Sequence, residues 1–506
     1  MPTISEISSL LETLTSSIDV FKAELTRQQL PEPSLSTSLP HAIDDPAYVS
    51  SPLLYEARRL AISSLASTSV ILCLGSVLIC LFKNQLRLLL ESPLEAVINT
   101  SSGSLEIQGL RLTTEIGLPE ILDAAADPEE GENIRVIAER TKTDEGKLEG
   151  ILRYVVKRGW FRETKPGYFS NNRRSCTLHN GRHGYHLIKN FIDYAYGVHG
   201  KLPELMTHPD ESFRMARDPT HTAWNIYANT DLPFFGPNGW LEKYPIEAQK
   251  FALGMGCLGV ASNGGVIYDF PWVEFCKGKD AIIDVGGGQG SLSCALAAAY
   301  PEIRPFVVQD LPGARESAHK FITSQGVSDR VKFEEQNFFE PNRRKGTGNY
   351  VFILQRILHD WSIEEGTKIL RRIRDCLVDS KVWAATVVAC DDDNDYGPSS
   401  QSTLVIIDPL LSPATFTAEA PSAKDSLSAL KGKSQYQPVP SPPFIPQDFG
   451  DNWLIAHGTN ASLIALYNTF EHTYSSMTHM LELVGMKIKR VNATRGSVQV
   501  MEIEIS

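Results

Sequence analysis

The sequence predicts an α/β protein, with a doubly wound, mostly parallel sheet in its C-terminal half and a mainly helical N-terminal half. From Ala281 onward, short apolar runs rich in β-branched residues alternate with helical segments. The first run ends at the chain's one glycine cluster, Gly286-Gly-Gly-Gln-Gly290, and an Ala/Leu-rich helix follows. Upstream, an amphipathic helix stops at Gly159 before two short runs that flank Lys-Pro-Gly, a pattern typical of a hairpin.

The composition is that of an ordinary globular protein. The 506 residues suffice for two or three domains, and 42% are hydrophobic and 21% charged. The net charge of −12 argues against nucleic acid as a general partner. Eight cysteines form no Cys-x-x-Cys pair, which predicts neither a zinc site nor a disulfide framework. Since the N-terminus also lacks a secretory pattern, we expect a cytoplasmic protein.

Residues 1–99 are predicted to hold helices, a Pro/Ser-rich linker and an uncharged apolar block at 61–82. The densest part, Val70 to Phe82, is short for a bilayer span. Three interpretations stay open: a membrane anchor, a buried helix, or an inserted stretch such as a translated intron. The last is a hypothesis that rests on Glu56–Leu65 and Asn84–Ala96, which would join into one amphipathic helix without the block. Sequencing the mature transcript tests it, and an uninterrupted reading frame there would sink it.

Residues 100–190 are predicted to form a winged helix, because short helices precede the hairpin around Lys-Pro-Gly. Residues 134–175 contain eleven Lys/Arg and five Asp/Glu, a local charge of +6 (11 − 5). One interpretation is a DNA-binding surface, and the other is a dimerisation module with a solvated basic face. Residues 191–270 are expected to be a helical connector.

Five strands are expected in residues 271–506, followed by a C-terminal helix and two closing strands. Two interruptions stand out. Residues 378–402 contain Trp383 to Ala389, which could be an extra strand, and Ser412 to Gly450 contains seven prolines and is expected to be a mobile loop or linker. The predicted strands are Ile282–Val285, Pro305–Gln309, Val331–Glu334, Tyr350–Leu354, Thr403–Ile407, Lys487–Val491 and Val498–Ile505.

The glycine turn predicts a site for an adenosine-containing cofactor. Gly286 and Gly288 fit the first and third places of a dinucleotide fingerprint, but the sixth place is Ser291, which weakens an NAD site. Asp310 ends the second strand, where a carboxylate can accept both hydrogen bonds of a ribose diol.

His359 is the strongest candidate for a catalytic residue, because it follows an apolar strand at the end of the sheet where the cofactor should bind. Asp408 and Glu471 could each accept a hydrogen bond from its Nδ1 and leave Nε2 facing a substrate. No metal is expected. His179, His183 and His186 would share a helical face with no fourth ligand, and the acid run at 391–395 lacks the Gly and Glu of a calcium loop.

Four motifs together resemble the plant-type and fungal S-adenosylmethionine-dependent O-methyltransferases, the metal-independent enzymes that methylate phenolic hydroxyls. The motifs, in the family's order, are Asp284-Val-Gly-Gly-Gly-Gln-Gly290, Val308-Gln-Asp-Leu-Pro312, Leu358-His-Asp-Trp361 and Phe470-Glu-His-Thr473. The run Thr230-Asp-Leu-Pro-Phe-Phe235 resembles the fungal members, which act mostly on aromatic polyketides and other secondary metabolites.

The resemblance implies a Rossmann-like methyltransferase domain behind a winged-helix dimerisation domain, S-adenosylmethionine as cofactor, a small aromatic substrate and a homodimer. Membrane contact is not expected unless it occurs through 61–82. The resemblance implies that His359 is the base and that Asp408 and Glu471 orient it. It also implies that the cofactor is held by Asp284, Gly286, Gly287, Gly288, Asp310, Leu311, Asn337, Phe338 and Gln355, and that the acceptor contacts Phe234, Met255, Trp361 and Asn468.

Two positions depart from the family pattern. Asn337 stands where an acid usually binds the adenine end, and Gln355 stands where a basic residue is usual. Two rival functions remain: an NAD-dependent oxidoreductase using the same sheet, and a winged-helix transcriptional regulator whose degenerate cofactor domain serves as a sensor.

Overall fold

A computed structural model describes residues 6–34, 37, 39, 41–45, 48–65, 93–236, 238–303, 305–346, 348–388, 402–413, 415, 420–433, 435–449 and 454–506. The chain divides into two compact units, which are described separately. Unit 1 comprises 1–200, 236–261 and 413–454, and unit 2 comprises 201–235, 262–412 and 455–506.

Unit 2 is built on the predicted sheet. Within the described residues the sheet has seven strands in the order β6-β5-β4-β7-β8-β10-β9. The five strands from β6 to β8 are parallel, and β10 is antiparallel to both of its neighbours. The α/β fold class is therefore confirmed. The strands are β4 (Ala281–Val285), β5 (Phe306–Asp310), β6 (Val331–Glu335), β7 (Tyr350–Gln355), β8 (Thr403–Asp408), β9 (Met486–Ala493) and β10 (Gln499–Ile505).

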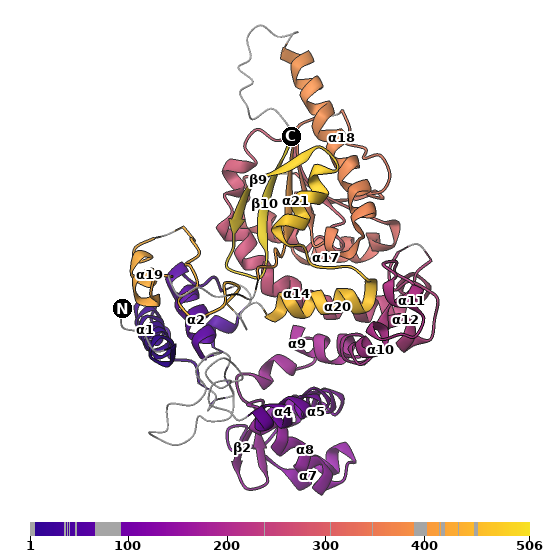
Figure 1. The fold of residues 1–506 in the computed structure, drawn as a ribbon. Helices are drawn as coiled ribbons and strands as arrows, with labels where there is room; N and C mark the ends of the chain where they lie inside the picture. The colour runs from indigo at the N-terminus through magenta and orange to yellow at the C-terminus, as the bar shows by residue number, and fades with distance from the viewer. Residues whose placement is uncertain are drawn as a thin grey trace. The chain divides into compact units, whose positions relative to one another are not determined.

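The sheet is covered on both faces because its central strands are apolar on both sides. One core joins the sheet to the end of α14 (Pro245–Asp269), α15 (Trp272–Phe275), α16 (Ser291–Ala299) and α17 (Arg315–Ser324). The other core joins it to α18 (Ile363–Val388) and α21 (Tyr474–Glu482) (Figure 1). The order of strands reverses between β4 and β7, so ligands are expected at the carboxyl ends of these two strands.

One predicted element in unit 2 is wrong. Trp383 to Val388 continues helix α18 and forms no extra strand. The sequence of this run has no strict alternation of apolar and polar residues, so the helix that begins at Ile363 extends through it with further i to i+4 hydrogen bonds. The rest of that insertion, 389–401, lies outside the described residues and includes the acid run.

The helices and hairpin expected in 100–190 form one part of unit 1. Helices α5 (Gly103–Glu115), α6 (Leu118–Asp123), α7 (Ile134–Thr141) and α8 (Glu145–Lys157) share a core with the hairpin. The hairpin is β2 (Arg162–Lys165) and β3 (Tyr168–Ser170), and β1 (Glu132–Asn133) pairs with β3. Gly167 has a φ of +76°, which a tight turn between β2 and β3 requires.

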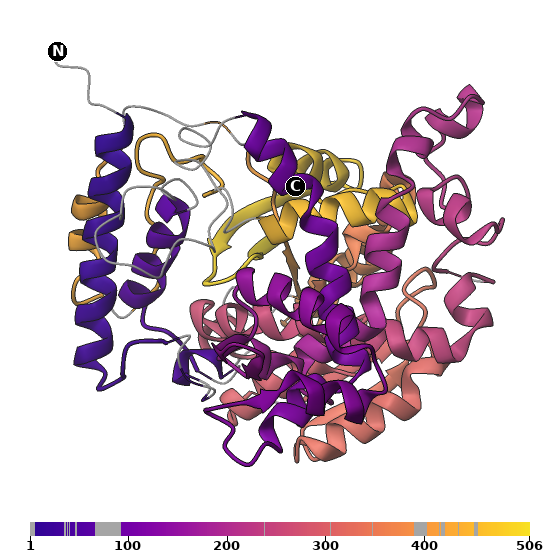
Figure 2. The same ribbon diagram turned by 90° about the horizontal axis from the view of Figure 1, so that it is seen from below.

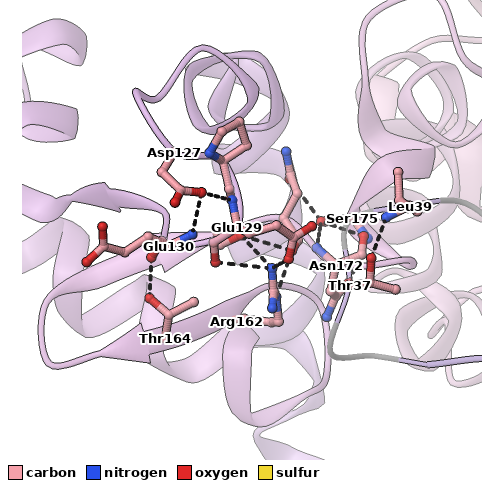
Figure 3. A network of polar contacts seen from close by, with 12 residues as sticks. Thr37, Leu39, Asp127, Glu129, Glu130, Arg162, Thr164, Asn172 and Ser175 are labelled. Carbon is pink, nitrogen blue, oxygen red and sulfur yellow. Dashed lines mark hydrogen bonds and ion pairs between the residues drawn. The ribbon is translucent and has the colours of Figure 1, made fainter.

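Most of the paired basic residues of this part contact acids from outside residues 134–175. Arg162 donates to Glu129 at 2.7 Å (Figure 3). It also donates to Ser170 Oγ at 2.9 Å. Among the described residues, seven of the eleven bases in 134–175 form ion pairs: Arg135, Arg140, Arg153, Arg158, Arg162, Lys165 and Arg173. The local +6 is thus largely neutralised by carboxylates such as Glu106, Glu129 and Glu132.

The proline-rich insertion is not a mobile linker, which corrects the prediction. Apolar side chains from 423–433 and 435–449 pack on the N-terminal helices α1 (Glu6–Arg27) and α2 (Pro52–Leu65), and α19 (Ala423–Ala429) lies beside them (Figure 2). Tyr436 donates to Glu56 at 2.8 Å, and Glu56 pairs with Arg59 at 2.6 Å. Burial of apolar groups such as Leu427 and Ile445, together with these polar bonds, orders the segment despite its prolines.

The apolar block at 61–82 falls mostly within residues 66–92, outside the described residues, so its three interpretations stay open. Among the helices that the structure describes, none is long and apolar enough to cross a bilayer. The other elements are η1 (Ala42–Asp44), α4 (Pro93–Ser101), η2 (Ser175–Leu178), α9 (His183–His186), η3 (Leu187–Phe191), η4 (Asp193–Gly197), α10 (Leu202–Met206), α11 (Glu211–Met215), α12 (Ala223–Ala228), α13 (Trp240–Lys243), η5 (Pro312–Ala314), η6 (Leu358–Asp360) and α20 (Leu454–Tyr467).

Candidate active site

The glycine turn after β4 is shaped for close approach of a ligand. Gly286, Gly288 and Gly290 have φ values of +72°, +57° and +84°, which residues with a Cβ rarely adopt. A Cβ on Gly286 would lie 2.7 Å from Ile357 Cδ1, whereas a Cβ on Gly288 would meet nothing within 4 Å. The turn is therefore packed at Gly286 and open at Gly288.

Two carboxylates flank the turn. Asp310, at the end of β5, accepts hydrogen bonds from the backbone N–H of Gly288 at 2.8 Å and of Leu311 at 2.7 Å. Asp284 is buried in β4 and accepts from Ser293 Oγ at 2.7 Å. Burial raises the pKa of Asp284 to about 6, and the charge of Asp310 adds to the effect. Asp284 thus holds the turn to α16, while Asp310 keeps lone pairs for a ligand.

Residues from the segments after β6 and β7 lie next to Gly286. Phe338 Cε1 would lie 3.4 Å from a Cβ on Gly286, so the segment after β6 reaches the turn. Asn337 is exposed, and its side-chain oxygen accepts from the Phe339 N–H at 3.0 Å. Gln355 donates to Asn263 Oδ1 at 3.1 Å. Leu311 is 53% exposed.

His359 lies in a buried cluster of carboxylates just past β7. Its Nδ1 is 2.9 Å from Glu471 Oε2, and its Nε2 is 3.6 Å from Asp360 Oδ1. Asp408, at the end of β8, is fully buried and neither of its carboxylate oxygens has a hydrogen-bond partner among the described residues. The structure brings His359, Asp408 and Glu471 together, from three segments that are far apart in sequence.

Electrostatics in this cluster favour the imidazolium. Burial lowers the pKa of His359, but the negative charges of Asp360, Glu471 and Asp408 outweigh burial and raise the pKa to about 10. Burial also raises the pKa of Asp408 to about 7 and of Asp360 to about 6, although the charge of His359 opposes both shifts. The hydrogen bond to Glu471 fixes the ring and leaves Nε2 on the side of Asp360.

The predicted acceptor residues fall into three settings. Phe234 is completely buried, with its ring 4.9 Å from that of Trp224. Asn468 donates both amide hydrogen bonds to backbone carbonyls, to Asp218 at 3.0 Å and to His221 at 2.7 Å. Trp361 packs edge-on against Phe338 and Phe339. Met255 lies on α14 within unit 1, whereas the other three belong to unit 2.

Three residues of this region were missed from the sequence. Ser293 fixes Asp284, Asp360 faces His359 Nε2, and the ring of Tyr467 packs at a tilt against that of Phe234. Asp360 stands inside the quoted Leu-His-Asp-Trp motif and could have been singled out by its adjacency to the histidine. No sequence signal marks Tyr467, because its partners come from a segment more than two hundred residues upstream.

The predicted histidine trio does not share a helix. His179 precedes α9 and its ring nitrogens contact Cys176 O and Asp123 Oδ2, at 2.9 and 2.7 Å. Within the described part of the chain, no group of three or more His, Cys, Asp or Glu side chains could hold a metal ion.

The chain is similar to known O-methyltransferases. Residues 271–403 match a family model described as the O-methyltransferase domain. The chain is 25% identical to the O-methyltransferase tpcA of Aspergillus fumigatus, over 82% of this chain and 83% of the relative. It is also 25% identical to the O-methyltransferase cicE of Emericella nidulans, over 95% and 85% respectively.

A solved structure extends the likeness in fold over nearly the whole chain. OxaC, determined in complex with S-adenosylhomocysteine and oxaline, aligns with a TM-score of 0.62 and 13% identity. The alignment covers 98% of this chain and 100% of OxaC. With only 13% identity, this comparison shows that the two chains share a fold and nothing about their function.

Proposed function

Because the chain belongs to the plant and fungal type of S-adenosylmethionine-dependent O-methyltransferases, we propose that it methylates a hydroxyl of a small aromatic molecule with His359 as general base. The observation that carries the proposal is the buried hydrogen bond between His359 Nδ1 and Glu471, beside the glycine turn of the neighbouring strand. The resemblance of Thr230-Asp-Leu-Pro-Phe-Phe235 to the fungal members of the family favours an aromatic secondary metabolite of polyketide type as the acceptor class.

The residues around the turn fit the cofactor. The space beside Gly288 is open, and within the described part of the chain only backbone N–H groups donate to the Asp310 carboxylate. A carboxylate oxygen has two lone pairs, so each oxygen can still accept from one ribose hydroxyl. Phe338 would offer an apolar edge to the adenine, and Asn337 would replace the usual acid with a weaker, neutral acceptor.

His359 would remove the acceptor proton at Nε2. A phenol has a pKa near 10, so it is mostly protonated at neutral pH, and a positioned base accelerates attack by roughly 10²- to 10⁴-fold. When bound, S-adenosylmethionine supplies an electrophilic methyl group on a sulfonium, whose positive charge also favours the neutral imidazole. Glu471 would stabilise the imidazolium after proton transfer, and Asp408 would add to that stabilisation in its ionised form.

The test is turnover by purified protein with S-adenosylmethionine and a panel of hydroxylated aromatic acceptors, read by mass spectrometry of the products. His359→Ala should bind S-adenosylhomocysteine with unchanged Kd and lose at least roughly 10²-fold in kcat, since general base catalysis is worth that much. His359→Gln serves as the conservative control for packing. Undiminished turnover by His359→Ala would refute the assignment of the base.

The rival functions have weaker support. The ion pairs of Arg162 and its neighbours leave few basic side chains for phosphates, which disfavours a DNA-binding regulator. Ser291 at the sixth fingerprint place disfavours NAD. Thermal shifts with S-adenosylhomocysteine and with NADH separate the two cofactors. We further propose a winged-helix dimerisation domain, a homodimer and a cytoplasmic location, which size-exclusion chromatography with light scattering and cell fractionation test.

A further inference from the structure

The orientation of Glu471 depends on its backbone, because few contacts orient its side chain. Glu471 Oε2 is 2.9 Å from His359 Nδ1, whereas Oε1 is buried and has no hydrogen-bond partner among the described residues. The side chain is fully buried, so contact with solvent does not orient it either. The direction in which this carboxylate points is therefore set by the backbone of residue 471 and by the packing around it.

An asparagine side chain holds that backbone. Asn460 lies on α20, and its Oδ1 accepts a hydrogen bond from the Glu471 N–H at 2.8 Å. A backbone N–H can only donate, so the amide oxygen of Asn460 is the atom that faces Glu471. Asparagine is less favourable than alanine inside a helix, because its side chain competes with the backbone for hydrogen bonds. The bond to Glu471 is a tertiary contact that offsets this cost to α20.

The residues directly after Glu471 are fixed from another side. The Leu411 N–H donates to His472 O at 2.8 Å, and Leu411 forms an isolated parallel bridge with Thr473. Thr473 is also the N-cap of α21. Since Leu411 closely follows Asp408 in the chain, these backbone bonds join the segment after one carboxylate to the segment after the other. Asn460 completes this frame, because it anchors the backbone of Glu471 itself.

We propose that Asn460 is a positioning residue for the methyl transfer, and that its hydrogen bond to the Glu471 backbone aligns the carboxylate with His359 Nδ1. The inference rests on the proposed function, since it gives Asn460 a part in presenting the base. Asn460 acts through Glu471 and not on the reacting atoms. Without the bond, the imidazole would sample more orientations and would spend less time at the distance that proton transfer requires.

The first test is the kinetics of Asn460→Ala with an acceptor that the wild type methylates. Alanine favours a helix, so the variant should fold. Its kcat should fall roughly 10-fold or more, since a displacement of about 1 Å can cost about 10²-fold in rate. Its Kd for S-adenosylhomocysteine should stay unchanged. The rise of kcat/KM with pH should move to lower pH, because a misaligned Glu471 stabilises the imidazolium less.

Two further variants separate positioning from stability. Asn460→Asp keeps an acceptor oxygen at the same place and should restore most of kcat. Asn492→Ala is the matched control, because it removes two hydrogen bonds that an asparagine on β9 donates to Val500 O and Glu502 Oε1, both at 3.1 Å. It should lower Tm and keep kcat and the pH profile of the wild type. A role for Asn460 in stability alone would give Asn460→Ala the same behaviour as this control and would overturn the inference.

The second test is a double-mutant cycle with Glu471→Ala. If Asn460 acts through Glu471, adding Asn460→Ala to Glu471→Ala should change kcat by less than about twofold. Losses in kcat that multiply in the double variant would overturn the inference, because they would mean that the two residues act independently. Failure of Asn460→Asp to recover any kcat would also overturn it.

A readout without turnover separates this inference from the proposed function. In protein labelled with ¹⁵N-histidine, the His359 signal is assigned by its absence in His359→Ala, and it should titrate at lower pH in Asn460→Ala than in the wild type. That shift in a protein that methylates no acceptor would support the anchoring of His359 through Asn460 and refute the proposed function. Methyl transfer by the wild type, with the same titration and the same kcat in Asn460→Ala, would overturn the inference and leave the proposed function standing.

Discussion

Placing a single methyl group at Gly288 should separate cofactor binding from folding. Gly288 has a φ of +57°, and a Cβ there would meet no atom within 4 Å. Gly288→Ala should therefore lower the free energy of unfolding only through the penalty that alanine incurs in the left-handed conformation, about 1–2 kcal/mol. This loss lowers Tm by a few degrees in a domain of this size, at about 2–4 °C per kcal/mol.

The same methyl group would occupy the space proposed for the cofactor. Overpacking by one methyl costs about 1–3 kcal/mol, which is roughly 5- to 150-fold in Kd. The assay is isothermal titration with S-adenosylhomocysteine beside thermal unfolding of each variant. Gly326→Ala is the matched control: it has a φ of +67° and open space for a Cβ in the same unit, after α17. It should lose the same few degrees and keep its affinity.

Gly286→Ala completes the series. Its Cβ would lie 2.7 Å from Ile357 Cδ1, so this variant should lose more stability than Gly288→Ala, because it adds a clash to the backbone strain. If Gly288→Ala binds S-adenosylhomocysteine as tightly as Gly326→Ala does, the open space beside Gly288 is not the cofactor site.

Three further predictions concern acid–base chemistry and stability. Below the His359 pKa of about 10, the neutral fraction of the ring grows about tenfold per pH unit, so kcat/KM should rise with pH through the neutral range. Glu471→Gln removes one negative charge and should move that rise to lower pH, and an unmoved profile would contradict the electrostatic argument. Asn468→Ala loses two hydrogen bonds to backbone carbonyls and should lower the free energy of unfolding, measured by chemical denaturation, by about 1–3 kcal/mol. Asn468→Gly loses the same two bonds but relieves the backbone strain at a φ of +58°, so the difference between the two variants gives the contribution of the strain. Tyr436→Phe removes the hydrogen bond that Tyr436 donates to buried Glu56, which should lower the free energy of unfolding by about 1–3 kcal/mol. Limited proteolysis within 413–454 should then be faster. Unchanged cleavage would mean that the insertion is held by its apolar contacts alone.

The pH dependence of folding follows from the same histidine. Its folded pKa lies above the unfolded value, so the stability it contributes is fully present below about pH 6.5 and is lost as pH rises through about 10. The raised pKa of Asp408 acts in the same direction, because this carboxyl ionises less readily in the folded protein than in the unfolded chain. The free energy of unfolding therefore falls as pH rises from the unfolded-state pKa of Asp408 to the folded-state pKa of about 7.

Much of unit 2 could be predicted from the sequence, because its signals are local. A β-branched run such as Ile282 to Val285 forms a buried strand wherever it packs, and three glycines with positive φ require a turn of one shape. All seven strands lie within two residues of their predicted positions. The prediction of an extra strand at Trp383 was wrong, because a helix that has already formed from Ile363 gains one hydrogen bond for each residue that it adds.

The sequence by itself determined the α/β class, and it was enough to predict the cofactor turn and the candidate base His359, since each of these rests on neighbouring residues. Only the tertiary structure decided what surrounds them. It placed Asp360 at Nε2 and Glu471 at Nδ1, buried Phe234 while leaving Phe235 exposed, and folded the proline-rich insertion onto the N-terminal helices. The physical reason is that burial, charge and ring contacts depend on distances between segments remote in the chain, which no local pattern encodes.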